Sequence, residues 1–309
     1  MTKHLHQERY ARIEALRYDY ASKPKVITQR CNLCGEDLFV TVVQRDRYGY
    51  PARGQACRRC SLTFLNPVMT AEAYGSFYQG FYRPLVSAYH GRLIDAANIQ
   101  DEQRDYAVTL ATLLDPHIAT LRGGRLLDIG GSTGVIAHHF RQAFAMHATV
   151  IDPAPMETEV ARRLELETVT ALVEDYDPGD SRFQLVLMCQ TVDHLLDIAS
   201  SLRKVHELLS DDGVFFIDIV DFTAAYRRNG SVEEAVKIDH PYYLTEATME
   251  AYLRRAGLAL REVSYAADHL HIGFVCTRTA PTPDALPPQE DVRDFFRDVR
   301  AVQNRVPSP

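Results

Sequence analysis

Leu126-Leu-Asp-Ile-Gly-Gly-Ser-Thr-Gly-Val-Ile-Ala137 is the stretch that decides the fold of this chain. Its apolar first half predicts a buried strand, and its second half predicts the start of a helix, with a glycine turn between them. Gly130 allows the chain to turn sharply, while Gly131 and Gly134 allow a ligand and the helix to approach the backbone. A strand, a glycine turn and a helix in this order are typical of a nucleotide-binding unit.

Strands and helices alternate around this turn. Strands are predicted at residues 125–129, 148–151, 168–173, 183–190 and 213–220, and helices at residues 134–145, 156–166, 197–209 and 245–256. Two further strands, 260–265 and 271–277, are joined by a short turn and must pair antiparallel. The pattern predicts an α/β fold with a doubly wound, mostly parallel seven-stranded sheet.

The acid after the second strand indicates what the turn binds. Asp152 follows Gly130 by 22 residues and ends the second strand, where a carboxylate can bind both hydroxyls of a ribose. A nicotinamide dinucleotide requires the pattern G-x-G-x-x-G, but the second and third glycine positions hold Ser132 and Val135. Asp128, two residues before the turn, also suits a different cofactor. A glycine turn without any cofactor is the structural alternative.

Four of the six cysteines occur as two pairs, Cys31-Asn-Leu-Cys34 and Cys57-Arg-Arg-Cys60, with 22 residues between the pairs. Two such C-x-x-C turns can supply four thiolates to one tetrahedral zinc ion, and four thiolates leave no open position for catalysis. Two disulfides or a reactive redox pair are the alternatives. A reducing cytoplasm disfavours the disulfides, and no thioredoxin-like unit is predicted around either pair.

The chain is expected to have five parts. These are an N-terminal helical arm (1–24), a zinc-binding ribbon (25–69), an aromatic and helical connector that covers the active site (70–121), the cofactor-binding domain (122–279) and a Pro-rich tail with a short helix at 289–303 (280–309).

Composition excludes several classes of protein. A hydrophobic fraction of 46% is ordinary for a globular protein and too high for a disordered one. The net charge of −7 does not favour a partner bound through its phosphates, so nucleic acid is not an expected partner. No apolar stretch is long enough to span a bilayer, and the first ten residues carry no signal-peptide core. We expect a cytoplasmic protein without a membrane partner, and the oligomeric state is not indicated.

The segment around Gly130 resembles motif I of class I S-adenosylmethionine-dependent methyltransferases. The resemblance implies S-adenosyl-L-methionine as cofactor, with Asp128 ordering the turn and the methionine amino end, and Asp152 binding the ribose. Ser132 stands where the family usually has its middle glycine. The family also places an acid after the third strand against the adenine; Asp175 is the expected residue, although that position can correspond to Leu172 or to an ordinary acidic loop.

A second resemblance concerns the reacting end. Val236-Lys-Ile-Asp-His-Pro-Tyr-Tyr-Leu-Thr245 is similar to the H-E-H-x-x-Y-F-S segment of bacterial C-methyltransferases that act on nucleotide-linked deoxy-keto-sugars. The resemblance implies His240 as the catalytic base, with Asp239 and Tyr243 beside it. After the fourth strand, where ligands bind in open α/β sheets, Gln190 and His194 are expected near the transferable methyl group.

The same family has an N-terminal zinc ribbon followed by tyrosines that cover the sugar. Tyr78 and Tyr82 are the expected counterparts, and Arg83 is a candidate for gripping a phosphate or carboxylate. Two positions depart from the pattern, because Lys237 replaces a tyrosine and Gln190 replaces an asparagine. These changes leave open whether carbon or oxygen is methylated.

The sequence therefore predicts a transferase of sugar biosynthesis that methylates a small-molecule acceptor, a sugar or nucleotide-linked sugar, with His240 or His194 as the base. Two alternatives remain. One is an RNA methyltransferase that presents its substrate through the arginine-bearing ribbon, and the other is a non-catalytic scaffold that binds S-adenosylmethionine.

Overall fold

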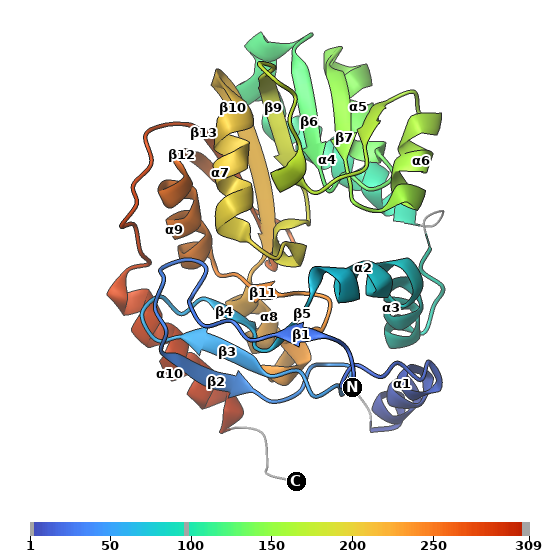
Figure 1. Cartoon of the computed structure of the whole chain (residues 1–309), viewed down its shortest axis with the longest axis vertical. Coiled ribbons are helices and arrows are strands. Elements are labelled where there is room, and N and C mark those ends of the chain that lie inside the picture. Colours follow the sequence, from blue (N-terminus) through green and yellow to red (C-terminus); the bar gives the residue numbers. More distant parts are fainter. Residues whose placement is uncertain (1–2, 96–98, 305–309) are drawn as a thin grey trace. The chain divides into compact units, whose positions relative to one another are not determined.

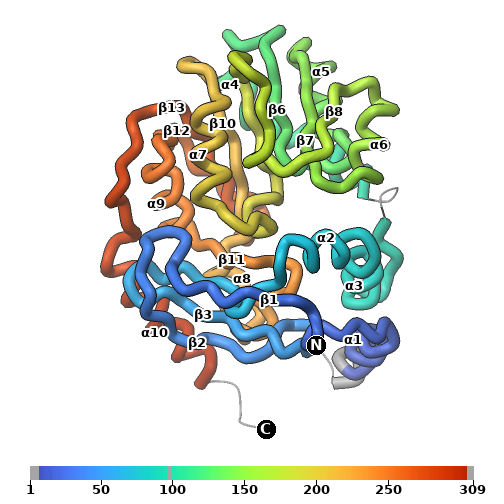
Figure 2. The backbone as a smooth tube through the Cα atoms, in the orientation of Figure 1, coloured from blue at the N-terminus to red at the C-terminus, as the bar shows by residue number. Residues whose placement is uncertain are grey.

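The computed structural model describes residues 3–95 and 99–304, which form two compact units (Figures 1 and 2). Unit 1 is built from three segments, residues 1–95, 220–248 and 286–309, and unit 2 from residues 96–219 and 249–285. Residues 1–2, 96–98 and 305–309, which fall within the predicted arm, connector and tail, lie outside the described residues.

Unit 2 contains a seven-stranded sheet with the order β12-β13-β10-β9-β6-β7-β8 (Figure 1). The strands are β6 (Arg125–Ile129), β7 (His147–Ile151), β8 (Glu167–Val169), β9 (Phe183–Met188), β10 (Leu209–Val220), β12 (Leu258–Tyr265) and β13 (His271–Arg278). The five strands from β10 to β8 pair in parallel, and β12 pairs antiparallel with β13. The predicted doubly wound, mostly parallel sheet is confirmed.

Helices cover both faces of this sheet. They are α4 (Ile99–Ile118), α5 (Val135–Phe144), α6 (Pro155–Arg163), α7 (Ile198–Leu208) and α9 (Glu246–Ala256). Side chains alternate between the faces of a strand, so Leu126 and Leu185 share one hydrophobic cluster with Leu114 of α4 and Phe140 of α5. The intervening residues point to the opposite face, where α7 lies in front of β10 in Figure 1.

One predicted element of unit 2 differs from the structure. The strand expected over residues 168–173 ends at Val169, and residues Val173–Asp175 form a short 3₁₀ turn instead. β8 is the outermost strand of the sheet and, among the described residues, pairs with β7 alone. An edge strand has hydrogen-bond partners on one side only, so a longer strand here would gain half the backbone pairing of a central one.

Unit 1 contains a four-stranded antiparallel sheet with the order β11-β4-β3-β2. Its strands are β2 (Phe39–Val43), β3 (Gly54–Cys57), β4 (Thr63–Leu65) and β11 (Tyr242–Tyr243), and a separate pair joins β1 (Lys25–Val26) to β5 (Val68–Met69). Three strands come from the cysteine-bearing segment, whereas β11 comes from a segment about 180 residues later. The sheet therefore joins the cysteine ribbon to the segment that carries His240.

Helices complete the core of unit 1. They are α1 (Lys3–Ala15), α2 (Ala71–Gly80), α3 (Tyr82–His90), α8 (Phe222–Asn229) and α10 (Gln289–Gln303). Aromatic residues from the first part of the predicted aromatic connector pack into this core, where Tyr74 and Phe77 are buried. The tail helix α10 also contributes, since Phe295 packs 6.4 Å from the ring of Phe222.

The first helix is shorter than its sequence pattern suggests. Helical spacing extends to Tyr20, but α1 ends at Ala15 and Arg17 adopts a left-handed conformation with φ of 53°. The turn brings Tyr18 and Tyr20 into the core of unit 1, where Tyr18 packs 4.5 Å from the ring of Phe81. Tertiary packing of these tyrosines replaces the continuation of the helix.

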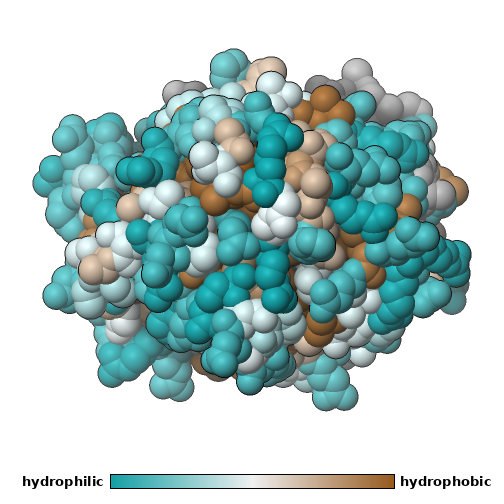
Figure 3. All heavy atoms as spheres, turned by 90° about the horizontal axis from the view of Figure 1, so that it is seen from above, coloured by the Kyte–Doolittle hydropathy of each residue, from teal (hydrophilic) through white to brown (hydrophobic). Residues whose placement is uncertain are grey.

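The face of the molecule in Figure 3 is mainly hydrophilic, with apolar residues in small groups between charged and polar ones. Among the described helices, none combines the length and the apolar character that crossing a membrane requires.

Candidate functional site

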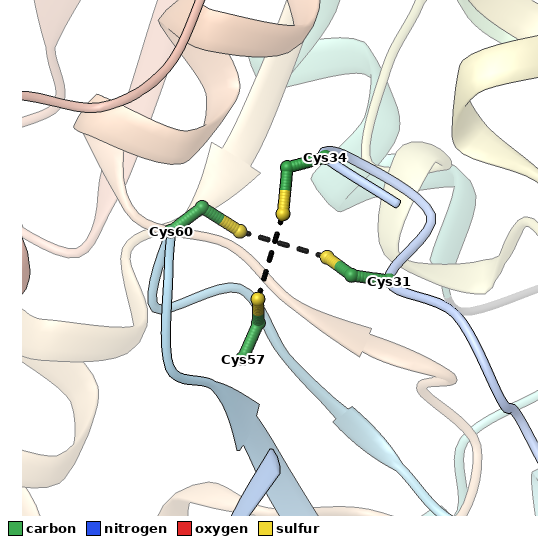
Figure 4. Close-up of side chains that lie close together, drawn as sticks. All are labelled: Cys31, Cys34, Cys57 and Cys60. Atoms are coloured by element: carbon green, nitrogen blue, oxygen red, sulfur yellow. Dashed lines mark hydrogen bonds between the residues drawn. The ribbon is translucent and has the colours of Figure 1, made fainter. Parts of the chain in front are cut away.

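The four paired cysteines form one cluster in unit 1 (Figure 4). The Sγ atoms of Cys31 and Cys60 are 3.5 Å apart, as are those of Cys34 and Cys57, and all four lie within 4.8 Å of one another. Sulfur ligands about 2.3 Å from a tetrahedral ion lie about 3.8 Å from each other. The six cysteine positions are all described, and none forms a disulfide. The donor set fits a closed, structural zinc site.

Local backbone bonds explain why the thiols converge. In the first knuckle, Cys31 N donates to Glu36 O at 2.8 Å and Gly35 N donates to Cys31 O at 2.8 Å. The second knuckle repeats both bonds around Cys57, with Ser61 at the position of Gly35. Both residues are left-handed, with φ of 75° for Gly35 and 59° for Ser61. This conformation turns the chain back after each second cysteine, so that each pair of thiols faces one centre.

The glycine turn of unit 2 is packed too tightly to carry side chains. A Cβ added at Gly130 would lie 2.4 Å from Thr191 Oγ1, and one at Gly131 would lie 2.6 Å from Asp128 Oδ2. Gly130 also has a positive φ of 69°, which disfavours other residues. The turn follows β6 at the carboxyl edge of the sheet, where ligands bind in open α/β folds.

Asp128 is the most unusual group near this turn. It is fully buried, and neither carboxylate oxygen has a well-aligned hydrogen-bond partner among the described residues; the backbone N–H of Ala137 lowers its pKa, but by less than burial raises it. Burial, together with the negative charge of Asp152, raises the pKa of Asp128 to about 7. A buried carboxylate without a partner is costly, and a cationic ligand group would offset that cost. The residue therefore fits the ammonium-bearing end of S-adenosylmethionine.

Asp152 organises the turn from the end of β7. Its Oδ2 accepts a hydrogen bond from Ser132 N at 3.0 Å, and its Oδ1 accepts one from Ala154 N at 2.8 Å. Ser132 Oγ in turn donates to Glu157 Oε2 at 2.8 Å. Glu157 was not predicted, although an acid in the first turn of α6 is a signal that could have been used. The two acids hold the loop that follows the glycines.

Gln190 lies at the end of β9, next to the turn in the sheet order. It has a left-handed backbone with φ of 49°, and its N–H donates to Asp218 Oδ1 at 2.5 Å. Asp218 is buried on β10, and its Oδ2 accepts a hydrogen bond from Tyr106 of α4 at 2.9 Å. Burial raises the pKa of Asp218 to about 6. Asp218 and Tyr106 were not predicted, because partners from separate elements have no common signal in the sequence.

Asp175 lies on the short 3₁₀ turn after β8 and is exposed. Its neighbour Glu174 instead accepts a hydrogen bond from Ser201 of α7. Nothing in the described contacts distinguishes Asp175 as a ligand group.

His240 lies in unit 1, in a buried loop before β11. Its Nε2 is 3.5 Å from Asp239 Oδ2, and its ring is stacked on that of Tyr243 at 6.4 Å. Lys237 Nζ lies 4.0 Å from the same Asp239 oxygen. The hydroxyl of Tyr243 accepts a hydrogen bond from Lys237 N at 2.9 Å and donates one to Lys237 O at 2.5 Å. The loop brings together an imidazole, a carboxylate and an ammonium group.

The predicted substrate residues lie on α2 and α3 of unit 1. The hydroxyl of Tyr78 donates to Asp239 O at 2.7 Å, and its ring packs 5.2 Å from that of Tyr82. The guanidinium of Arg83 lies 5.6 Å from the centre of the Tyr82 ring. Tyr78 thus contacts the segment that carries His240.

The predicted site residues divide between the units. Unit 1 contains the predicted metal, substrate and base residues, which are the four cysteines, Tyr78, Tyr82, Arg83, Asp239, His240 and Tyr243. Unit 2 contains the predicted cofactor residues and the alternative base, which are Asp128, Gly130, Gly131, Ser132, Gly134, Asp152, Asp175, Gln190 and His194. His194 ends a 3₁₀ turn, Val192–His194, after β9, and its N–H donates to Thr191 O at 3.0 Å.

Comparison with known proteins supports the assignment of unit 2. Residues 100–263, more than half of the chain, match a family model described as a methyltransferase domain. The 1,6-didemethyltoxoflavin-N1-methyltransferase of Burkholderia thailandensis, solved with S-adenosylhomocysteine, has a TM-score of 0.51 at 17% identity, covering 71% of this chain and 96% of that one. The PH0226 protein of Pyrococcus horikoshii has a TM-score of 0.50 at 14% identity, covering 58% and 92%. At these identities the likeness concerns the fold.

One curated relative aligns over more of the chain than that domain. The C-methyltransferase NovU of Streptomyces niveus is 26% identical over 273 residues, which cover 81% of this chain but only 60% of NovU. A ubiquinone biosynthesis O-methyltransferase of Methylocella silvestris is 32% identical over 102 residues, 31% of this chain and 40% of that protein. Because a family model spans most of unit 2 and the sheet has the strand order described above, the chain belongs to the methyltransferase domain family and has the class I S-adenosylmethionine-dependent fold.

Proposed function

We propose that this protein transfers a methyl group from S-adenosylmethionine to a small-molecule acceptor, and that the acceptor is a sugar or nucleotide-linked sugar. The observation that carries the cofactor assignment is Asp128, a buried carboxylate against the glycine turn that has no well-aligned hydrogen-bond partner among the described residues. The assignment to a sugar rests on the segment Asp239-His240-x-x-Tyr243, which resembles that of deoxysugar C-methyltransferases, and is supported by alignment with a C-methyltransferase over 81% of the chain.

The cofactor supplies a methyl group on a sulfonium, which is already a good leaving group. The protein then has to bind it, orient the acceptor and accept a proton. In unit 2, Asp152 binds the ribose hydroxyls with its carboxylate, which the N–H groups of Ser132 and Ala154 orient. Asp128 compensates the cationic methionine end, and the backbone beside Gly131 and Gln190 completes the site.

His240 accepts the acceptor's proton in this proposal. For a carbon acceptor, His240 would take the proton of the C–H bond beside the carbonyl, and the electron pair left on that carbon would displace the sulfur from the methyl group, so that the methyl–sulfur bonding electrons stay on a neutral sulfur. Asp239, 3.5 Å from His240, stabilises the imidazolium that results. Burial raises the pKa of Tyr243 well above 10, and its hydroxyl is occupied by the Lys237 backbone, so it positions the loop. His194 is the alternative base.

We also propose that the cysteine cluster binds one structural zinc ion. Three of its thiols are almost completely buried, and the four sulfur atoms already have the spacing that a tetrahedral ion requires. Since β4 pairs with β11, the metal would stabilise the sheet whose strand β11 follows His240.

The RNA alternative gains little from the ribbon arginines. Arg53 donates to Asn66 O at 2.7 Å, and the guanidinium of Arg47 lies 4.1 Å from the centre of the Tyr89 ring. Both are used inside unit 1, so the exposed Arg58 and Arg59 are poor support for a phosphate-binding surface. Titration with RNA at several salt concentrations tests the RNA alternative. Turnover with any acceptor argues against the other alternative, a non-catalytic scaffold that binds S-adenosylmethionine.

Zinc removal gives the first prediction. Thiolate binding of zinc contributes about 10–16 kcal/mol in small zinc-dependent peptides and is coupled there to folding. We expect one zinc per chain, and Cys60→Ser should unfold or precipitate unit 1, whereas Cys276→Ser, at a buried thiol of unit 2, should retain the metal. Elemental analysis of freshly purified protein checks this, and the absence of zinc from the wild type would refute the site.

Asp152 gives the second prediction. Asp152→Asn preserves shape but removes the charge, and losing a charged hydrogen-bond partner costs about 1.5–3 kcal/mol, or roughly 10–150-fold in affinity. Calorimetry should show this loss for S-adenosylmethionine, with the fold intact. Glu159→Gln, an exposed acid of α6, is the control and should bind normally. Equal affinities for the two variants would exclude Asp152 from the cofactor site.

Asp128 gives a prediction about pH. Because burial raises the pKa of Asp128 in the folded protein from its ordinary value of 3.8 to about 7, ionisation opposes folding as pH rises from about 4 to 7. Asp128→Asn should therefore stabilise the cofactor-free protein increasingly between pH 5 and pH 8, while weakening binding of S-adenosylmethionine. Thermal unfolding at several pH values measures the first effect. A stability difference independent of pH would show that Asp128 is not titrating there.

His240 gives the fourth prediction. His240→Ala should lower kcat roughly 10²–10⁴-fold for a nucleotide-linked keto-sugar, with cofactor affinity near that of the wild type. His90→Ala, at an exposed histidine of α3, is the matched control. Transfer of a labelled methyl group measures the rate. Near-normal turnover of His240→Ala from pH 6 to 9 would make His240 structural and shift the role of base to His194 or a tyrosine.

A further inference from the structure

The loop that carries His240, residues Val236–His240 (the His240 loop), has no helix or strand of its own. Four of its five residues are nonetheless buried, and only Lys237 is partly exposed. Buried backbone N–H and C=O groups must be hydrogen-bonded, since leaving them unsatisfied is costly. The loop therefore depends on partners from elsewhere in unit 1.

Those partners are mostly side chains from distant segments. The hydroxyl of Tyr74 donates to Ile238 O at 3.0 Å, and that of Tyr78 donates to Asp239 O at 2.7 Å. Arg47 N donates to Val236 O at 2.9 Å. Two tyrosines of α2 and one backbone group of the ribbon thus hold three of the loop's carbonyls.

Asp46 accepts a hydrogen bond from a backbone N–H group of the loop, whereas the partners above bind its carbonyl groups. It is fully buried in the turn between β2 and β3. Its Oδ1 accepts hydrogen bonds from Tyr48 N at 3.1 Å and Tyr50 N at 2.9 Å, which shape the turn. Its Oδ2 accepts a hydrogen bond from Ile238 N at 3.0 Å. One carboxylate therefore ties the ribbon turn to the residue two places before His240.

The same turn also contacts the carboxylate beside His240. The hydroxyl of Tyr48 donates to Asp239 Oδ1 at 3.3 Å, while Asp239 Oδ2 faces His240 and Lys237. Tyr48 is itself buried, with 2% of its surface exposed. The turn of residues 46–50 thus fixes both the backbone of the His240 loop and the side chain of Asp239.

We propose that Asp46 is a positioning residue for the reaction: through Ile238 N and through the Tyr48 turn, it holds the Asp239–His240 pair in its working geometry. The ribbon then has a second role besides binding metal, because its turn sets the location of the base. This inference rests on the proposed function for its catalytic consequence, but its structural part can be tested separately.

Asp46→Asn is the informative variant because it is isosteric. The amide oxygen can still accept from Tyr48 N and Tyr50 N, whereas the amide nitrogen would face Ile238 N, donor against donor. We expect faster hydrogen–deuterium exchange in the peptide that spans the His240 loop. We also expect a changed NMR chemical shift of the proton on His240 Cε1. Zinc content and affinity for S-adenosylmethionine should stay at wild-type values. Unchanged exchange and an unchanged His240 signal would overturn the proposal.

A second variant tests the loop without altering a charge. Tyr74→Phe removes the hydroxyl that donates to Ile238 O and should loosen the same peptide. Tyr20→Phe is its matched control, because the hydroxyl of Tyr20 is buried in the same core and has no hydrogen-bond partner among the described residues. Equal exchange rates in the Tyr74 and Tyr20 variants would contradict the idea that side-chain bonds hold this loop.

Kinetics with a thymidine-diphosphate-linked 4-keto-6-deoxyhexose separates the inference from the proposed function. Asp46→Asn should lower kcat about 10-fold, the effect of one lost hydrogen bond of about 1.4 kcal/mol, with the KM for S-adenosylmethionine unchanged. In a His240→Ala background, Asp46→Asn should change kcat less than 2-fold, because the group that it positions is gone.

The outcomes are distinguishable. If His240→Ala itself retains turnover, the proposed base is wrong, and exchange and chemical shift still decide whether Asp46 holds the loop. If the loop loosens in Asp46→Asn but kcat stays normal, or if the loss of kcat persists undiminished without His240, the positioning role is refuted.

Discussion

The geometry of unit 1 depends on one constraint, which is that the irregular, buried His240 loop must find hydrogen-bond partners outside itself. A helix would satisfy its own backbone and a strand would pair with a neighbouring strand, but this loop takes partners from the ribbon turn, from α2 and from β11. Each partner is itself held by the core of unit 1 or by the sheet β11-β4-β3-β2. The cysteine cluster lies beside β2, β3 and β4, in the sheet to which β11 belongs, and β11 directly follows the loop.

A different constraint governs the cofactor site in unit 2. There the turn after β6 excludes side chains at Gly130 and Gly131, because a Cβ would collide with Thr191 or Asp128, and Asp152 holds the following residues through their N–H groups. The burial of Asp128 is unfavourable in this arrangement, because its carboxylate is removed from water and has no well-aligned hydrogen-bond partner among the described residues. Groups whose ionisation is unfavourable in the free protein are typical of binding sites, where the ligand restores the balance of charge.

Much of this organisation was readable from the sequence because it depends on short-range patterns. The glycine turn, the alternation of strands and helices, and Asp152 at the end of the second strand predicted the class I sheet, and the strand order agrees. The two C-x-x-C pairs predicted the cysteine cluster, because each knuckle is closed by bonds between residues at most five positions apart. Local signals were also missed: α8 is capped at its start by Asp221, whose side chain accepts from Ala224 N, and at its end by Gly230, yet no helix was predicted there.

The sequence by itself determined the fold class, the glycine turn, the paired cysteines and the motif around His240, since in each case the necessary residues are close along the chain. Only the tertiary structure decided that α1 stops at Ala15, that β11 joins the ribbon sheet, and that Asp46, Tyr48 and Tyr74 surround the His240 loop. Asp46 and Ile238 are 192 residues apart, and Tyr106 and Asp218 are 112 apart. Contacts at such separations arise from the packing of whole elements, which no local periodicity or spacing encodes, and so they became visible only in the folded chain.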